Sequence, residues 1–235
     1  MLKAYQEQRE MPESQSLSFD ERFALLLDRE ATERANRRLT TRLKKAKLRQ
    51  AATVEDIDYR HPRGLDKRLM LALASCDWIR HHDNCIITGP TGAGKTYLAC
   101  ALGHTACREG FTALYLRLPR LFQQLAIARG DGNYTRLLNT FARTDLLLLD
   151  DWGTACLTDE QRRDLFEILE DRYDRRATLV AAQLPIKHWH DVIGDPTLAD
   201  AILDRLVHNA HMINLKGDSM RKKRKTLTNT PNTGT

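Results

Sequence analysis

No apolar run in this chain of 235 residues approaches the roughly 18 residues that a membrane-spanning helix needs. The first residues, Met1 to Gln6, also lack the apolar core of a signal peptide. We therefore expect a cytoplasmic protein. Hydrophobic residues make up 42% and charged residues 29% of the sequence, which is typical of a folded globular protein. The length allows one α/β domain with a small appendage.

Cysteine is scarce, and its spacing excludes the common zinc sites. No C-x-x-C pair occurs among the five, which are Cys76, Cys85, Cys100, Cys107 and Cys156. Four of them have apolar neighbours, so we expect buried free thiols. His188 and His190 form an H-x-H pattern, but no third ligand is evident and we assign no metal there.

Glycine and proline are absent from residues 18 to about 50, so nothing there interrupts a helix. Ser18 and Glu21 have the spacing of a capping box, which predicts where the helix begins. We expect one long helix, or two with a break. A poorly ordered segment, Met1–Leu17, should precede it, and a turn-rich linker, Ala52–Gly64, should follow.

Beyond the linker, apolar strand-like runs alternate with helix-like segments. The first helix is expected over Leu65–His82. The strand candidates are Cys85–Thr88, Ala113–Leu116, Leu146–Asp150, Thr178–Ala182 and Met212–Leu215. Alternation of this kind predicts an α/β fold, with a five-stranded parallel sheet flanked by helices.

A glycine-rich motif lies between the first strand candidate and the helix-like run Tyr97–Glu109. Its residues are Gly89, Pro90, Thr91, Gly92, Ala93, Gly94, Lys95 and Thr96. Strand, glycine-rich loop and helix form the context of a phosphate-binding loop, in which backbone N–H groups surround a polyphosphate. Lys95 would supply a cation to the β- and γ-phosphates of ATP, and Thr96 a hydroxyl to Mg²⁺.

Four leucines lead into two acids, Asp150 and Asp151, which is the pattern of a buried strand whose end meets a ligand. We expect Asp150 to hold Mg²⁺ and Asp151 to orient the attacking water. The alternative is a strand that ends in a turn with both carboxylates solvated. One strand-helix unit, Ala113–Ala128, separates the two motifs, so their strands need not be neighbours in the sheet. This favours ATPases with an added strand over small-molecule kinases.

The net charge is +6, and much of the excess is concentrated in one segment without an acid. Its basic residues are Arg34, Arg37, Arg38, Arg42, Lys44, Lys45, Lys47 and Arg49. Such a run favours sequence-independent contact with DNA phosphates, since each neutralised phosphate releases counterions. A solvated helix face is the alternative. A second basic run, residues 221–225, would add phosphate contacts or only solubilise the tail.

Several motifs together resemble IstB-type transposition helpers, ATPases of the AAA+ class that are similar to DnaC-type helicase loaders. The resemblance extends over roughly Leu39–Arg224. The motifs that carry it are Asp150–Gly153, Gln183–Pro185, Gly194–Leu206 and Gly217–Lys222. It implies an AAA+ core that assembles around double-stranded DNA, with ATP bridging the subunits of an oligomer. It also implies a partner transposase.

The same resemblance implies roles for three further residues. Arg205 would be the arginine finger that reaches a neighbouring subunit's γ-phosphate, with Arg172 and Arg175 as weaker candidates. Gln183 would be the first sensor, and Arg221 the second sensor within its own subunit. The alternatives are that Arg205 is a surface arginine paired with nearby acids, and that Arg221 simply belongs to the basic run.

We therefore expect a helical, basic region for DNA or partner binding at 1–63, an AAA+ ATPase domain at 64–225 and a polar tail at 226–235. The predicted function is that of an ATP-dependent DNA-binding regulator that assists a transposase in target selection. A DnaC-like helicase loader is an alternative in the same class. A basic DNA-binding protein with a nucleotide switch is a third reading, and a metabolic kinase a fourth, although no small-substrate site is visible.

Overall fold

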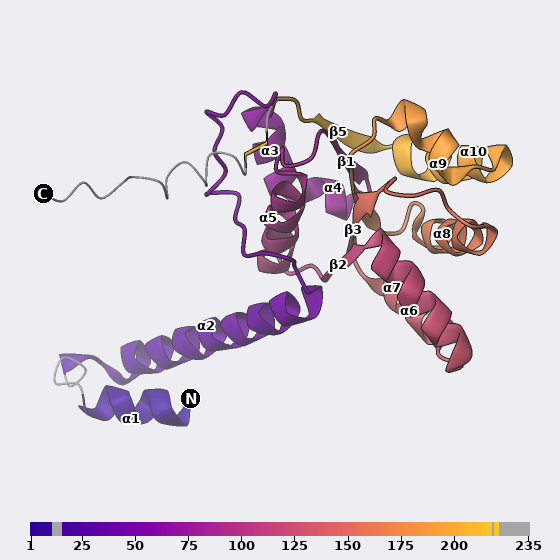
Figure 1. Cartoon of the computed structure of the whole chain (residues 1–235). Helices are drawn as coiled ribbons and strands as arrows, with labels where there is room; N and C mark the ends of the chain where they lie inside the picture. The colour runs from indigo at the N-terminus through magenta and orange to yellow at the C-terminus, as the bar shows by residue number, and fades with distance from the viewer. Residues whose placement is uncertain (11–15, 218, 221–235) are drawn as a thin grey trace, which may run out of the picture. The chain divides into compact units, whose positions relative to one another are not determined.

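The computed structural model describes residues 1–10, 16–217 and 219–220, and the chain divides into two compact units between Lys44 and Lys45. Figure 1 labels the elements. The helices are α1 (Leu2–Glu10), α2 (Phe19–Ala46), α3 (Lys67–Ala74), α4 (Asp77–Arg80), α5 (Lys95–Arg108), α6 (Leu118–Gly130), α7 (Tyr134–Arg143), α8 (Asp159–Arg172), α9 (Trp189–Ile193) and α10 (Pro196–Val207), with a 3-10 helix, η2, at Ile186–His188. The strands are β1 (Asn84–Thr88), β2 (Ala113–Arg117), β3 (Leu146–Trp152), β4 (Ala177–Ala182) and β5 (Ala210–Asn214).

The first unit contains α1 and most of α2, which is one unbroken helix. Its expected capping box is present: the N–H of Ser18 donates to Oε2 of Glu21 at 2.8 Å, and the N–H of Glu21 donates to Oγ of Ser18 at 3.3 Å. The expectation that Met1–Leu17 is poorly ordered is wrong for α1. That helix is tied to α2 because the amino group of Met1 bonds Oε2 of Glu30 at 2.8 Å.

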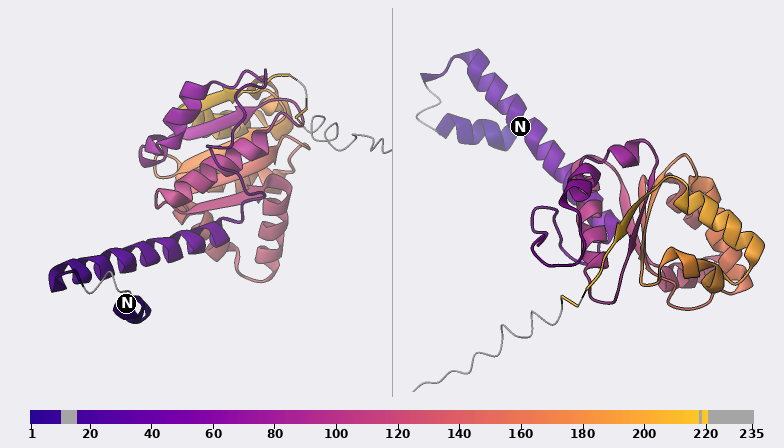
Figure 2. Two further views of the ribbon diagram at one scale, coloured as in Figure 1. Left: turned by 90° about the vertical axis from the view of Figure 1, so that its left-hand side faces the viewer. Right: turned by 90° about the horizontal axis from the view of Figure 1, so that it is seen from above.

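The second unit, from Lys45, is built on a five-stranded parallel sheet with the order β2-β3-β4-β1-β5. All five predicted strands are confirmed. The helices α3, α4 and α5 cover one face of the sheet, and α6 to α10 cover the other (Figures 1 and 2). The predicted turn-rich linker lies within this unit, whereas the functional boundaries predicted at residues 63 and 225 remain predictions.

Strand β4 lies between β1 and β3, so the strands that precede the glycine-rich loop and the two acids are not neighbours. Leu179 of β4 faces Cys85 of β1 on one side and Leu148 of β3 on the other. Neighbouring strands are about 4.8 Å apart, so the ends of β1 and β3 are separated by about 10 Å. The residue that follows β4 therefore lies between the two motifs.

The predicted helix Leu65–His82 is instead two short helices, α3 and α4. The chain turns at Cys76, which has φ +61. The break is stabilised locally, because the hydroxyl of Ser75 donates to the carbonyl of Ala72 at 2.8 Å and the indole N–H of Trp78 donates to the carbonyl of Leu73 at 2.9 Å. Sequence periodicity does not reveal such side-chain bonds.

Four cysteines are buried thiols, as expected, and Cys156 is exposed. Burial raises the pKa of Cys76 to about 11 and that of Cys85 to about 12. Within the described ranges, no helix combines the length and the apolar character that crossing a bilayer requires.

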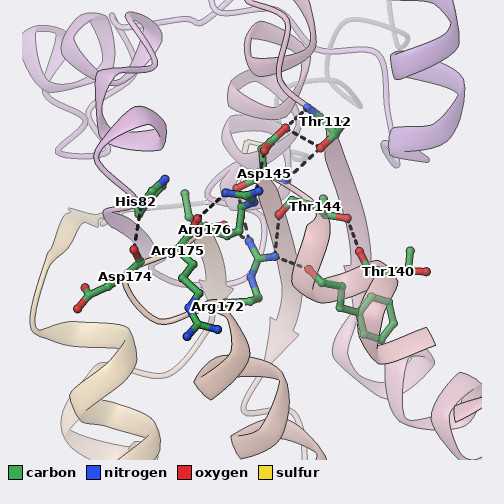
Figure 3. A network of polar contacts seen from close by, with 11 residues as sticks. His82, Thr112, Thr140, Thr144, Asp145, Arg172, Asp174, Arg175 and Arg176 are labelled. Atoms are coloured by element: carbon green, nitrogen blue, oxygen red, sulfur yellow. Dashed lines mark hydrogen bonds and ion pairs between the residues drawn. The ribbon is translucent and has the colours of Figure 1, made fainter. Parts of the chain in front are cut away.

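A buried arginine, Arg172, hydrogen-bonds several segments at the end of the sheet where the strands begin (Figure 3). It ends α8 and is 1% exposed. Its guanidinium donates to Oγ1 of Thr178 at 3.0 Å, to the carbonyl of Thr144 at 2.8 Å, and to the carbonyls of Phe141 and Ala177. Burial lowers the pKa of Arg172. The residue joins the end of α7 to the starts of β3 and β4.

We predict that Arg172→Leu destabilises the protein by about 3 kcal/mol, because several buried carbonyls lose their donor. Arg175→Leu, an exposed neighbour, should change the free energy of unfolding by less than about 0.5 kcal/mol. Urea denaturation followed by circular dichroism measures both. Equal effects of the two substitutions would show that the Arg172 network is not structural.

Candidate nucleotide-binding site

The glycine-rich loop, residues 89–94, joins the end of β1 to the start of α5. Gly89 and Gly94 have φ +149 and +98, values that L side chains rarely adopt. A Cβ at Gly89 would lie 2.6 Å from the carbonyl oxygen of Leu215, and one at Gly94 would lie 2.5 Å from Nη1 of Arg63. The backbone conformation therefore favours glycine at both positions, and at Gly89 the neighbouring backbone also leaves no room for a side chain. The loop leads directly into the positive end of the α5 dipole.

The ammonium group of Lys95 is held inside this loop. Its Nζ donates to the carbonyl oxygens of Gly89 at 2.6 Å and Pro90 at 2.9 Å. The residue is 8% exposed. A buried cation at the mouth of a helix dipole is chemically suited to a polyphosphate, whose oxygens would replace these carbonyls as acceptors.

Asp150 and Thr96, the two expected metal ligands, are in direct contact although 54 residues separate them. Asp150 is 2% exposed. Its Oδ2 accepts hydrogen bonds from the hydroxyls of Thr96 at 2.7 Å and Tyr115 at 2.6 Å, and its Oδ1 accepts from the N–H of Asp151 at 2.9 Å. A hydroxyl and a carboxylate beside a phosphate-type loop are the oxygen donors that suit Mg²⁺, so the residues present fit that ion.

Asp151 occupies a bulge at the end of β3. The register with β4 is regular up to Leu149 and shifts before Trp152. Asp151 has φ +60, a conformation that aspartate tolerates better than most residues. Its side chain is 20% exposed and forms an ion pair with Arg117, at the end of β2. The bulge thus separates one buried carboxylate from one accessible carboxylate.

Gln183 immediately follows β4, between the two motifs. Its Oε1 accepts a hydrogen bond from the hydroxyl of Thr91 at 2.9 Å. The structure therefore places the amide at the rim of the glycine-rich loop. An amide in that place has a donor and an acceptor available for a phosphate oxygen or a water.

Arg205 lies at the opposite end of the sheet. Its carbonyl accepts from Nδ2 of Asn84, the first residue of β1, at 2.8 Å. The loop follows the last residue of β1, about 16 Å away along the strand. The side chain pairs with Glu170, and its guanidinium carbon lies 5.1 Å from the ring centre of Phe166. Arg205 therefore lies far from the loop of its own chain, with its guanidinium held by Glu170 and Phe166.

The two weaker candidates for the arginine finger, Arg172 and Arg175, differ in exposure to solvent. Arg172 is wrong as a finger, because its guanidinium is buried and bonded to backbone carbonyls. Arg175 is exposed and lies at the same end of the sheet (Figure 3). Arg221 lies outside the described residues, as does the basic run that contains it. The N–H of Met220, just before it, donates to the carbonyl of Gly92 at 3.0 Å.

The basic residues predicted to meet DNA fall into three groups. Arg34 pairs with Glu30 at 2.7 Å and Arg37 with Glu33 at 3.5 Å. Arg49 behaves differently, since its Nη1 lies 4.0 Å from Oδ2 of Asp150. The remaining members are exposed, apart from the half-buried Arg42: they are Arg38, Lys44, Lys45 and Lys47.

Three residues at the site carry no motif and were missed from the sequence: Arg63, Tyr115 and Arg117. Arg63 is 2% exposed and donates to the carbonyl of Ala93 at 3.1 Å. Tyr115 and Arg117 come from β2. Arg117 stands opposite Asp150 in the register of β2 and β3. That pairing was predictable only with the strand order known.

The chain is similar to proteins that are named as ATP-binding proteins of insertion sequences. A family model described as IstB-like ATP binding protein matches residues 1–228. A protein of Sinorhizobium fredii that bears the name insertion sequence ATP-binding protein is 55% identical, over 94% of this chain and 91% of its own length. One named for the insertion sequence IS21 of Pseudomonas aeruginosa is 33% identical, over 92% and 82%.

Solved structures match in fold. The DnaC helicase loader superposes with a TM-score of 0.59 at 20% identity, over 70% of this chain and 97% of that one. DnaA of Aquifex aeolicus, solved with AMPPCP, gives 0.60 at 20% identity, over 77% and 56%. The chain therefore shares the fold of these proteins, and the predicted five-stranded parallel sheet flanked by helices is confirmed.

We predict that Arg63→Met loosens the glycine-rich loop without unfolding the sheet, because methionine fills the space but cannot donate to the carbonyl of Ala93. Amide hydrogen exchange in residues 89–96 should accelerate about tenfold, while exchange in β3 and β4 stays unchanged. Exposed Arg60→Met is the control. Unaltered exchange in the loop would refute a supporting role for Arg63.

Proposed function

The chain belongs to the family of IstB-like ATP binding proteins, and we propose that it is an ATP-dependent DNA-binding ATPase that assembles on duplex DNA and assists a transposase in target selection. One observation carries the nucleotide part of this proposal. The hydrogen bond between Thr96 and Asp150 joins the end of the glycine-rich motif to the end of β3. Two separate sequence motifs thereby form one site.

ATP binds, in this proposal, with its triphosphate in the loop of residues 89–94. Backbone N–H groups, the α5 dipole and the ammonium group of Lys95 hold the phosphate oxygens. Thr96 and Asp150 would hold Mg²⁺, which would supply positive charge to the β- and γ-phosphates. The hydroxyl of Thr96 must then turn from the carboxylate of Asp150 toward the ion.

Hydrolysis depends on the accessible carboxylate. Asp151 orients the attacking water, and Gln183 contacts that water or the γ-phosphate from the rim of the loop. Aspartate is one methylene shorter than the glutamate frequent at this position in related ATPases, so turnover is slow. The ion pair with Arg117 occupies Asp151 in the present conformation and must open before the water is oriented.

Self-association is the next part of this proposal, and the position of Arg205 supports it. A residue at the strand-beginning end of one sheet can serve only the phosphates bound by a neighbouring chain, where it stabilises the charge of the transferring phosphoryl group. ATP thus bridges subunits. In the single chain, Glu170 and the ring of Phe166 hold the guanidinium, and a neighbour's γ-phosphate replaces Glu170 as its anionic partner.

DNA binds through the basic segment from Arg34 to Arg49, largely without regard to base sequence. The exposed side chains along α2 reach phosphates, whereas the pairs with Glu30 and Glu33 open or persist at little cost, because exposed ion pairs contribute little. The relatives' names, which refer to insertion sequences, support a transposase over a replicative helicase as the partner. The DnaC likeness concerns the fold alone.

We predict that Asp151→Asn separates binding from turnover. The amide keeps the shape of the site but cannot orient water as a base, so the ATPase rate should fall about a hundredfold while nucleotide affinity stays within about twofold. Lys95→Ala should lose nucleotide affinity at least about tenfold, because a charge-assisted phosphate contact disappears. Phosphate release with duplex DNA present and fluorescent-nucleotide titration measure the two quantities.

The matched control for that experiment is Asp159→Asn, which neutralises an aspartate on α8 that is 81% exposed. It should change neither quantity. Full turnover by Asp151→Asn would overturn the role of Asp151, and full affinity of Lys95→Ala would overturn the nucleotide site itself.

We predict a steep fall of duplex affinity with salt, because phosphate contacts release counterions. The double variant Arg38→Gln with Lys44→Gln should lower the slope of log affinity against log salt by about two, equally for unrelated sequences. Fluorescence anisotropy at several potassium chloride concentrations measures this slope. Arg163→Gln, an exposed arginine on α8, is the control. A slope unchanged by the double variant would exclude these residues as phosphate contacts.

A further inference from the structure

Arg49 is the one member of the predicted DNA-contacting set that faces the carboxylate of the nucleotide site. Its Nη1 lies 4.0 Å from Oδ2 of Asp150. Its guanidinium also bonds the hydroxyl of Tyr115, and this contact, with the nearby Asp150 and Asp151, raises the pKa of Arg49. Tyr115 in turn donates to Oδ2 of Asp150 at 2.6 Å. Arginine, tyrosine and aspartate thus form a chain of polar contacts.

The backbone around Arg49 is fixed to the helix that follows the glycine-rich loop. Ala46 is fully buried, and a Cβ built at Gly103 of α5 would lie 3.0 Å from the side chain of Leu48. Backbone groups of Arg49 and Gln50 also reach the thiol of Cys100 on α5. The main chain therefore stays beside the site, while the Arg49 side chain, 46% exposed, has solvent access to an outside phosphate.

Two cations would compete for one carboxylate. Oδ2 of Asp150 is the atom that Thr96, Tyr115 and Arg49 all approach, and the same carboxylate is the proposed ligand of Mg²⁺. A positive charge already at 4 Å repels an arriving divalent ion and stabilises the ion-free arrangement. An external anion that draws the Arg49 guanidinium away from Asp150 removes this repulsion and therefore favours binding of the divalent ion.

We infer that Arg49 is a positioning residue that couples DNA to the nucleotide site: it holds Asp150 in the ion-free state, and duplex DNA draws it away and so favours binding of magnesium-nucleotide. The inference rests on the proposed function. Coupling of this kind is reciprocal, so magnesium-nucleotide must raise DNA affinity by the same factor. The remaining basic residues contribute DNA affinity without this coupling.

The test is binding of a fluorescent, non-hydrolysable ATP analogue to the full chain, with and without Mg²⁺ and with and without duplex DNA. Arg49→Gln should raise affinity in Mg²⁺ without DNA by about fivefold and leave affinity in EDTA unchanged. DNA should raise affinity in Mg²⁺ by about fivefold for the natural chain and by less than about twofold for the variant. Arg49→Lys, which keeps the charge, should behave like the natural chain.

Arg108→Gln is the charge-matched control, because Arg108 is equally exposed but pairs with Glu55. It should leave the Mg²⁺ and DNA dependences unchanged. The inference is overturned if Arg49→Gln shows the natural dependence, or if Arg108→Gln reproduces its effect. Absence of nucleotide binding by the natural chain itself would overturn the proposed function instead.

Discussion

The carboxylate of Asp150 has almost no access to water, so neighbouring groups must stabilise its negative charge by hydrogen bonds. Two hydroxyls and a backbone N–H do so, and they come from the start of α5, from β2 and from the bulge of β3 itself. A single buried charge thus fixes three parts of the chain relative to one another. Arg49 adds a fourth part, from beyond the end of α2. In the proposed function, the contacts that satisfy this buried charge are also the ones that Mg²⁺ would have to displace.

The order of the strands explains how the remaining residues are distributed. With β4 inserted between β1 and β3, Gln183 comes between the glycine-rich loop and the acids. The opposite end of the same sheet is fastened by Arg172, a fully buried guanidinium bonded to backbone oxygens and to Thr178. Arg205 lies at that rigid end. In the proposed assembly, this rigid end of the sheet would keep the distance between Arg205 and a neighbouring chain's nucleotide constant.

The sequence predicts those features that depend on neighbours along the chain. The five strands, the capping box at Ser18, and the contact between the glycine-rich loop and the end of β3 were all accessible from spacing and residue type. Features that depend on contacts across the sheet were not. Tyr115 and Arg117 acquire meaning only once β2 is known to adjoin β3. Arg172 was a candidate for the arginine finger, but it is a structural residue, because its guanidinium bonds groups of β4 and of the turn before β3 that only the folded sheet brings together.

The uneven burial of the thiols offers a practical route to watching this molecule work. Protonation and burial protect Cys76 and Cys85 from electrophiles, and Cys100 and Cys107 are likewise inside. A maleimide dye would therefore attach at Cys156 without prior mutagenesis. That residue stands between β3 and α8, five positions after Asp151 in the chain, so a fluorophore there would report rearrangement of the bulge at Asp151 in real time.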